Sequence, residues 1–310
     1  MNIEKELARI KPSRDTLFSI GVFDGVHIGH QHLLTHLKNQ ADQHNWLSGV
    51  ITFKSHPEKV ITSVPQPWLI ELDERVNQIK RLGIDTVVIL EFSQSLKQLT
   101  AREFLQLLKK YLRIRGLIVG PDFALGKNRE GNQEKLRLLG AELDFTVEVM
   151  EPFILDGEVV SSSGIRQMLA RGEVFKAARF LGRPFSLSGK PVSGDHRGRI
   201  LGSPTINLEP KADMASPGDG VYVTISHLDR FLLPSVTNIG IRPTFGGKKR
   251  IIETHLLDYQ GKLTLEKIEI DFIDKLRDEI QFHNADELKA QIAKDVAAAK
   301  ALLEKQILQT

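Results

Sequence analysis

Two histidines that lie close together, His27 and His30, are the first candidates for chemistry. They end the segment GVFDGVHIGH, which stands between the apolar run LFSIGVF and the amphipathic run QHLLTHLKNQA. Side chains three apart on a first helical turn share a face and can meet one ligand. Zinc-binding helices usually place histidines four apart and need a third ligand, which disfavours a metal site. A capping or surface role is the alternative to a phosphate site, and Gly21 and Gly29, which allow close approach of backbone to ligand, favour the phosphate.

Two loops are expected at the same edge of the fold as the histidines. His56 follows the strand-like run SGVITF, and Asp122 follows the run GLIVG. Either loop alone is more typical of an ordinary connection. Because ligands of parallel α/β sheets bind beyond the carboxyl ends of the strands, we nevertheless expect both loops near the site.

A third segment, VSSSGIRQML, combines hydroxyl groups with a cation. Ser162 and Ser163 precede or begin a predicted helix that carries Arg166. Serines at this position often serve as N-caps. Hydroxyls, free backbone N–H groups and an arginine also suit a triphosphate, so both interpretations stay open.

The second half of the chain has a different glycine-rich segment, GDHRGRILGSPTINLEP, which contains Gly194, Arg199 and Gly202. Composition alone favours a turn-rich connection between strands. As a site, its glycines would let backbone N–H groups surround a phosphate. The Thr205 hydroxyl and the Asn207 side-chain oxygen could then complete a magnesium shell, because Mg²⁺ prefers hard oxygen ligands.

Downstream, the alternating segment RIIETHLLDY carries two carboxylates, Glu253 and Asp258. A carboxylate near a strand end is usually solvated. A general base that takes the proton of a primary alcohol must, however, be a group of this kind held within hydrogen-bond reach.

Bulk composition excludes several other classes of site and partner. The 310 residues carry a formal charge of only +3, which does not indicate a nucleic-acid or membrane-surface binder. The chain has no cysteine, so disulfides, thiolate nucleophiles and Cys-based zinc sites are excluded. The charged N-terminus lacks the apolar core of a signal peptide, and no apolar run could span a bilayer, so we expect a cytoplasmic protein.

The elements that must position the first group of residues form a βαβ series. Leucine or isoleucine recurs at helical spacing between the apolar runs, which predicts a parallel sheet covered by helices. Asp73 and Thr100 stand at expected N-caps, and Thr100 with Glu103 forms a capping box. The strands are expected at 17–23, 48–53, 85–92, 116–120 and 145–150.

After Ser161 the pattern changes. SGIRQMLARG and EVFKAARFLG predict two short helices, each closed by a glycine. Short strands with turns then follow, as in an antiparallel barrel or sandwich, and Asn284 with Glu287 marks the start of a long C-terminal helix. A boundary near Arg183 divides the chain into domains 1–183 and 184–310.

At this point the sequence resembles a known family. GVFDGVHIGHQHLL, VITFKSHP, LIVGPDFALG and VSSSGIRQMLARGEVFKAARFLGRPF are similar to the adenylyltransferase half of the prokaryotic bifunctional riboflavin kinase/FMN adenylyltransferases, also called FAD synthetases. This half belongs to the HxGH nucleotidyltransferases, relatives of class I aminoacyl-tRNA synthetases. The resemblance implies a Rossmann-like α/β domain that transfers AMP from ATP to the phosphate of FMN, releasing pyrophosphate, without a covalent enzyme intermediate.

The second half resembles the riboflavin kinase module of the same family. GDHRGRILGSPTINL, PGDGVYVT, NIGIRPTFGG, ETHLLDYQGKL and FIDKLRDEIQF carry the similarity. It implies a small antiparallel β-barrel with a C-terminal helix that transfers the ATP γ-phosphoryl group to the 5′-hydroxyl of riboflavin. ATP, riboflavin, FMN and Mg²⁺ are the implied small molecules, and FAD is the final product.

Residue roles follow from the resemblance position by position. The resemblance implies catalytic roles for His27, His30 and Glu253, with Glu253 as the base. It also implies that Thr205 and Asn207 contact magnesium and the ADP phosphates. Ser163 replaces the usual threonine and keeps the hydroxyl, whereas Ser203 replaces a frequent phenylalanine and loses aromatic area. The ATP-phosphate residues are Gly29, Ser162, Ser163, Arg166, Gly194, Arg199 and Gly202, with Ser162, Ser163 and Arg166 as the counterpart of the KMSKS loop. The flavin or nucleotide loops contain Gly21, Asp24, His56, Asp122, Arg242 and Arg277.

Two rival functions are less consistent with the sequence. One is an HxGH adenylyltransferase for another phosphate with an inactive barrel, which retention of Thr205, Asn207 and Glu253 disfavours. The other is an RNA-binding module, which would need aromatic platforms and a basic surface, whereas aromatic residues make up only 6% of the chain. We therefore expect small-molecule substrates, no nucleic-acid or membrane partner, and a monomer or weak homo-oligomer.

Overall fold

The computed structural model describes residues 3–57, 66–192, 205–228, 231–244, 247–259 and 266–307, with the backbone alone at 210, 242–244, 247–249, 306 and 307. The chain forms two compact units, Met1–Ser162 and Ser163–Thr310. No helix in the described ranges is both long enough and apolar enough to cross a membrane.

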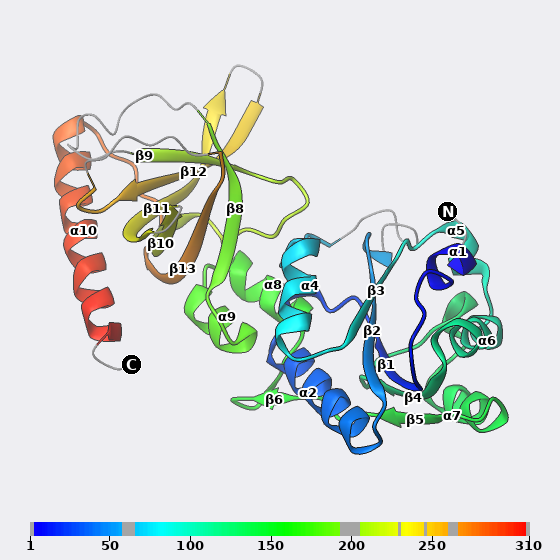
Figure 1. Cartoon of the computed structure of the whole chain (residues 1–310). Coiled ribbons are helices and arrows are strands. Elements are labelled where there is room, and N and C mark those ends of the chain that lie inside the picture. The colour runs from blue at the N-terminus through cyan, green and yellow to red at the C-terminus, as the bar shows by residue number, and fades with distance from the viewer. Residues whose placement is uncertain are drawn as a thin grey trace. The chain divides into compact units, whose positions relative to one another are not determined.

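The first unit is built on a parallel sheet, which confirms the predicted α/β class. The sheet has the order β3-β2-β1-β4-β5, and every neighbouring pair is parallel. Figure 1 shows this sheet with helices on both of its faces. Its strands are β1 (Thr16–Ile20), β2 (Leu47–Phe53), β3 (Thr86–Leu90), β4 (Ile114–Val119) and β5 (Thr146–Val149).

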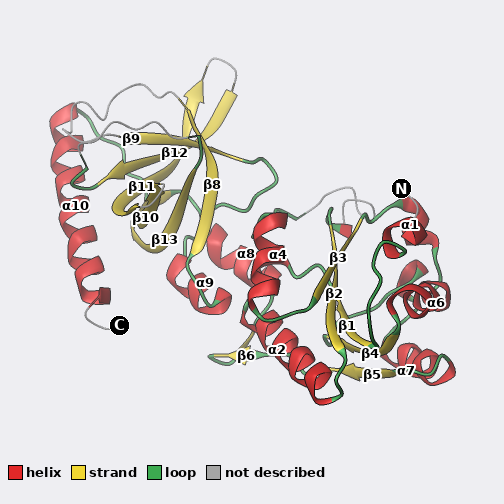
Figure 2. Ribbon diagram, in the orientation of Figure 1, coloured by secondary structure: helices red, strands yellow, loops and turns green. Residues whose placement is uncertain are grey.

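Two apolar cores hold helices against opposite faces of the sheet. Leu34 and Leu37 of α2 (Ile28–Gln43) pack with Val50 on one face, whereas Leu105 of α6 (Ala101–Leu112) packs with Phe18 on the other. Alternating strand residues point to opposite faces, so both faces need apolar cover. Figure 2 shows the strands between the two helical layers. The helices of this unit are α1 (Ile3–Leu7), α2 (Ile28–Gln43), α4 (Leu72–Arg81), α5 (Gln94–Gln98), α6 (Ala101–Leu112) and α7 (Gln133–Glu142), with the 3₁₀ turns η1 (Asp24–Val26) and η2 (Lys127–Arg129) and the hairpin β6 (Ile154–Leu155) and β7 (Glu158–Val159).

Local signals predicted some boundaries of these elements and missed others. The Thr100 side chain accepts from the Glu103 N–H, and the Glu103 carboxylate accepts from Thr100, which confirms the capping box. The Asp73 prediction is wrong, since the N-cap of α4 is Glu71 and Asp73 lies in the first turn. Strand β1 ends at Ile20, earlier than predicted, because Phe23 adopts a left-handed conformation and the chain turns into η1.

The second unit begins with two short helices that each end before a glycine in the left-handed conformation, as predicted. A closed antiparallel barrel follows, in the order β10-β11-β12-β9-β8-β13, which decides between the predicted barrel and sandwich. The elements are α8 (Ser162–Ala170), α9 (Val174–Leu181), β8 (Phe185–Val192), β9 (Thr205–Pro210), β10 (Gly220–Leu228), β11 (Phe231–Thr244), β12 (Gly247–Leu256), β13 (Ile268–Arg277) and α10 (Ala285–Ile307).

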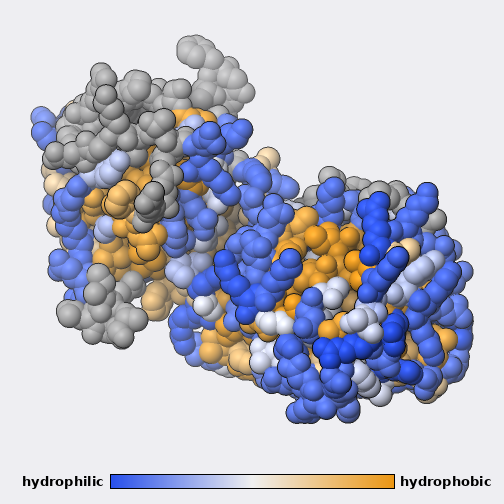
Figure 3. All heavy atoms as spheres, viewed as in Figure 1, coloured by the Kyte–Doolittle hydropathy of each residue, from blue (hydrophilic) through white to orange (hydrophobic). Residues whose placement is uncertain are grey.

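Helix α10 covers one outer face of the barrel. Its Ala299 and Leu303 pack on Val221, Val223 and Val236 of the strands. Figure 3 shows hydrophilic atoms along the outer side of this helix and hydrophobic atoms between the helix and the barrel. The Asn284 side chain accepts from the Glu287 N–H (2.9 Å), which confirms the predicted helix start.

Candidate active sites

The order of the first sheet marks where a ligand site should lie. Strand β1 is the central strand, and the chain winds outward from it to β2 and β3 on one side and to β4 and β5 on the other. In open α/β sheets, ligands bind at this switch point, beyond the carboxyl ends of the strands. The loops that follow β1 and β4 carry His27 and Asp122, so the structure brings these predicted residues to the switch point.

The histidine pair forms the start of α2. His27 is the N-cap, and its Nδ1 accepts a hydrogen bond from the His30 N–H (3.3 Å). The two rings stack with centroids 3.6 Å apart and planes 15° apart. An Nδ1 that accepts carries no proton, so neutral His27 bears its proton on Nε2. The capping role uses Nδ1 alone, and His27 also lines a cavity, so a capping role does not exclude a ligand-facing role.

Burial sets the protonation of the second histidine. The pKa of His30 is held well below its usual value of 6.5, first by burial and then because His27, whenever it is protonated, and Arg75 repel a positive charge on this ring. Its Nδ1 is buried and has no hydrogen-bond partner in the described structure. His30 is therefore a neutral imidazole in the ligand-free protein.

Gly29 leaves room for this arrangement. A Cβ there would lie 3.3 Å from ring atoms of His27 and 3.4 Å from the Cβ of Phe153. These contacts are tighter than ordinary, so a side chain at this position would require the His27 ring to shift by a few tenths of an ångström. The close approach of backbone to ligand that the sequence suggested for Gly29 stays a prediction.

Two cavities meet at the carboxyl edge of the sheet. One, of about 360 Å³, is lined by His27, Gly29, His30 and Ser162. The second, of about 490 Å³, is more apolar and is lined by His56 and by Phe53, Phe92, Phe104 and Phe123. Gly21 and Asp122 line both cavities. The structure therefore gathers most of the predicted residues of this unit around two adjoining spaces.

Asp24 lies outside both linings. Only 2% of its surface is exposed, and its carboxylate accepts from the Leu69 N–H at 3.0 and 3.1 Å. The carbonyl of Asp24 accepts from the Ser162 hydroxyl (2.9 Å), which ties the start of α8 to the loop after β1. Ser163 and Arg166 follow in the first turns of α8, where residues three apart share a face.

Arg75 supports the chain beside this site, and the sequence interpretation missed it. It is 1% exposed, and its guanidinium donates to the carbonyls of Val22 (3.1 Å) and Phe53 (2.6 Å), where the chain leaves β1 and β2. It also lies 4.5 Å above the Trp68 ring centre. Burial lowers its pKa to about 10, so it remains charged at neutral pH. The sequence contained one indication that Arg75 is buried: it lies four residues before Ile79 and therefore shares the face of α4 that packs on the sheet.

In the second unit, strand register places the predicted base among polar neighbours. Glu253 on β12 pairs with Asn207 on β9 and with Asn238 on β11. Directly opposed residues of antiparallel strands point to the same face. The Thr205 side chain shares this face because it lies two residues from Asn207, and it pairs with His255.

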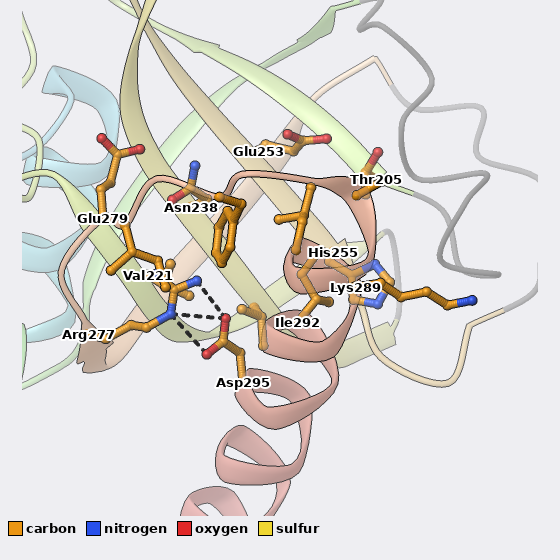
Figure 4. Close-up of a pocket in the computed structure, with 15 residues that line it drawn as sticks. Thr205, Val221, Asn238, Glu253, His255, Arg277, Glu279, Lys289, Ile292 and Asp295 are labelled. Carbon is orange, nitrogen blue, oxygen red and sulfur yellow. Dashed lines mark hydrogen bonds and ion pairs between the residues drawn. The ribbon is translucent and has the colours of Figure 1, made fainter.

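A cavity of about 340 Å³ lies over this face, between the barrel and α10. Thr205, Asn238, Glu253 and His255 line its barrel side, whereas Lys289 lies on the helix (Figure 4). Asn207 is beside Glu253 but is not part of the lining. Burial lowers the pKa of His255, and its Nδ1 has no hydrogen-bond partner in the described part of the chain.

Arg277 lines the same cavity, but its guanidinium is engaged by α10. Its Nε donates to Asp295 Oδ1 (3.0 Å) and its Nη2 to Oδ2 (2.8 Å), and Asp295 is only 5% exposed. Figure 4 shows this pair at one end of the cavity. Gly194, Arg199 and Gly202 lie outside the described residues, as does the side chain of Arg242.

The fold and these sites define a class before any comparison. The protein has an α/β unit with two adjoining cavities at its switch point, followed by an antiparallel barrel with a separate polar cavity. A family model for FAD synthetase matches residues 9–164, and one for riboflavin kinase matches residues 181–303. The chain belongs to the bifunctional riboflavin kinase/FMN adenylyltransferase family.

Bacterial relatives with that name match nearly the whole chain. The protein from Pseudomonas fluorescens is 37% identical and covers 97% of this chain and 98% of its own length. The Escherichia coli K12 protein is 38% identical and covers 93% of both chains. The Haemophilus influenzae protein is 34% identical over 91% of this chain and 92% of its own.

A solved structure is also similar along the chain. A crystal structure from Streptococcus pneumoniae, described as a macrolide-efflux protein, has a TM-score of 0.87 and 28% identity. The match covers 95% of this chain and 96% of that chain. The efflux description applies to that protein, whereas the family models and the three bacterial relatives agree on the flavin-enzyme family.

Proposed function

We propose that this chain makes FMN and then FAD: its barrel phosphorylates riboflavin with ATP, and its α/β unit adenylylates FMN with a second ATP. The observation that carries the proposal is the match of both family models, in this order, to units that each hold a separate cavity. We assign residues 1–183 to the adenylyltransferase domain and 184–310 to the kinase domain.

In the α/β unit, we assign ATP to the cavity beside the histidine pair and the flavin ring to the apolar cavity beside it. Four phenylalanines around the second cavity suit a planar aromatic ring. Gly21 and Asp122 border both cavities, so they lie where the phosphate of FMN must approach the α-phosphate of ATP. Ser162, Ser163 and Arg166 are the remaining phosphate contacts of this assignment.

These residues have two tasks: to position the two substrates and to stabilise negative charge. The phosphate oxygen of FMN attacks the α-phosphorus of ATP, and pyrophosphate leaves with the bond electrons. His27, the neutral His30 and the N-terminus of α2 stabilise the negative charge that grows on the phosphate oxygens. No residue has to act as a nucleophile in this step.

In the barrel, Glu253 is the assigned base. It takes the proton of the riboflavin 5′-hydroxyl as the oxygen attacks the γ-phosphorus of ATP, and ADP leaves. Its neighbour Asn238 is placed to hold either the carboxylate or the hydroxyl. The partly exposed Glu253 carboxylate is able to release the proton to solvent afterwards.

Magnesium fits the oxygen atoms of this site. Among the described residues no three His, Asp or Glu side chains converge on one point. Mg²⁺ in phosphoryl-transfer sites commonly uses few protein ligands and completes its shell with phosphates and water. The Thr205 hydroxyl and the Asn207 side-chain oxygen, on the face of Glu253, are the residues that would hold it, and it would neutralise the ATP phosphates. A cytoplasmic location and a monomer or weak homo-oligomer complete the proposal.

A direct test is to incubate the purified chain with riboflavin, ATP and Mg²⁺ and to separate the flavins by chromatography. The proposal predicts FMN first and FAD later. FMN without FAD would contradict the assignment of the α/β unit, and FAD formed only from added FMN would contradict that of the barrel. A chain that forms neither product would return the RNA-binding module to consideration.

A further inference from the structure

None of the roles assigned so far explains why a glycine lies inside one of the barrel strands. Gly240 lies within β11, is buried, and pairs with Ile251 of β12. Glycine weakens a strand interior and often marks close approach of another group. Its φ is outside the left-handed region, so the backbone conformation does not require a glycine.

The space above Gly240 is occupied by a carboxylate. A Cβ at this position would overlap Oε1 of Glu279, which follows β13 in the sequence, and would lie 2.6 Å from its Cδ. Glu279 is exposed at the cavity mouth, and no hydrogen bond or ion pair of its carboxylate is found among the described residues. An acceptor is thus held against the strand with its oxygens available for a ligand.

Glu279 lies close to the assigned base. Asn238 and Gly240 share a strand face because they are two residues apart, and Asn238 pairs with Glu253. Diagonal neighbours of this kind are roughly 7–8 Å apart. Figure 4 shows Glu279 and Glu253 on either side of Asn238.

We propose that Glu279 binds the ribityl chain of riboflavin by accepting hydrogen bonds from its secondary hydroxyls, and that Gly240 positions this carboxylate. The inference rests on the proposed kinase function. If Glu253 binds the terminal hydroxyl, the rest of the polyol must extend along the cavity. Glu279 lies against Gly240, two residues beyond Asn238 on β11, and is therefore the next acceptor in that direction. Ile280, Phe282 and Ile292 of the same lining supply an apolar wall for the ring system.

Two single substitutions and their combination test the contact from both sides. Glu279→Ala removes the acceptor, and Gly240→Ala adds a methyl group where the carboxylate now lies. Each should raise the KM for riboflavin roughly tenfold, as expected for loss of a hydrogen bond to a charged group, with little change in the KM for ATP. In the double variant the carboxylate is already gone and its space is empty, so Gly240→Ala should add nothing further. Glu266→Gln, at an exposed glutamate outside the cavity, is the matched control.

Lumiflavin, which carries a methyl group in place of the ribityl chain, separates the polyol from the ring. Used as an inhibitor of riboflavin phosphorylation, it should keep its Ki in Glu279→Ala while the KM for riboflavin rises. An equal loss for both flavins would mean that Glu279 contacts the ring and would overturn the inference. Unchanged constants for both, or additive effects in the double variant, would also overturn it. A wild-type chain without kinase activity would instead contradict the proposed function itself, and this inference would fall with it.

Discussion

At the scale of single residues, the histidine pair combines helix capping with a place in the lining of a cavity. His27 uses Nδ1 to accept from the His30 N–H, and His30 is held neutral first by burial, with the charge of Arg75 acting in the same direction. A neutral imidazole carries one N–H group, so each ring can donate a hydrogen bond from one nitrogen only. A phosphate bound beside this pair would therefore meet hydrogen-bond donors and the dipole of α2, and not two imidazolium charges.

This protonation state predicts how stability depends on pH. Because the folded-state pKa of His30 lies well below 6.5, its contribution is fully present above about pH 6.5 and is lost as the pH falls toward the folded-state pKa. The slope should approach about 1.4 kcal/mol per pH unit for one proton. His30→Gln removes the titrating group and should flatten this part of the profile.

Urea unfolding between pH 5 and 7.5 measures the effect. Both tryptophans, Trp46 and Trp68, belong to the first unit, so their fluorescence follows that unit alone. The wild-type chain should lose stability relative to His30→Gln as the pH falls. Parallel profiles for the two proteins would show that His30 is not the group responsible.

At the scale of elements, Arg75 connects α4 to the ends of β1 and β2. Its two hydrogen bonds satisfy the carbonyls of Val22 and Phe53, both at the edge where the ligand cavities lie. A buried carbonyl that loses its donor is costly, at about 1–3 kcal/mol for each group. Arg75 therefore acts as a positioning residue, through the loops that it holds.

The matching prediction compares two substitutions at this position. Arg75→Met should lower the free energy of unfolding of the first unit by about 1–3 kcal/mol, because the Phe53 carbonyl loses its Arg75 donor, whereas the Val22 carbonyl keeps a hydrogen bond from the Thr52 hydroxyl. Arg75→Lys should recover part of this loss, since an ammonium can satisfy one of them. Tryptophan fluorescence in urea reports the stability, and FMN adenylylation should fall in the same order while riboflavin phosphorylation is unchanged. If Met and Lys are equally tolerated, the carbonyl contacts do not matter.

The sequence predicted the elements better than the contacts between them. The Thr100 and Asn284 caps were predictable because both partners lie within one helical turn. Asp73 was assigned wrongly because a carboxylate is favourable both at an N-cap and in the first helical turn. For the sites, motif residues such as His27 and Glu253 were found from local segments. Asn238, His255 and Glu279 were missed because only the packing of distant segments brings them to a cavity. Arg75 was missed because its contacts with Val22 and Phe53 join residues far apart in the sequence.

At the scale of the whole molecule, each unit contains its own cavity with its own polar groups. The described residues that line the cavity of the barrel all belong to the second unit, and those around the histidine pair belong to the first. The central claim is therefore that one chain holds two chemically separate active sites, with Glu253 serving one and His30 the other.

The most direct test follows both reactions in two single variants. Glu253→Gln should reduce FMN formation from riboflavin by roughly 10²-fold or more, the usual contribution of a general base, and leave the conversion of FMN to FAD near the wild-type rate. His30→Ala should reduce FAD formation by about 10²-fold, the usual cost of one charge-stabilising donor, while FMN accumulates. Chromatographic separation of the flavins over time gives both rates in one experiment. Equal loss of both activities in either variant would contradict two separate sites.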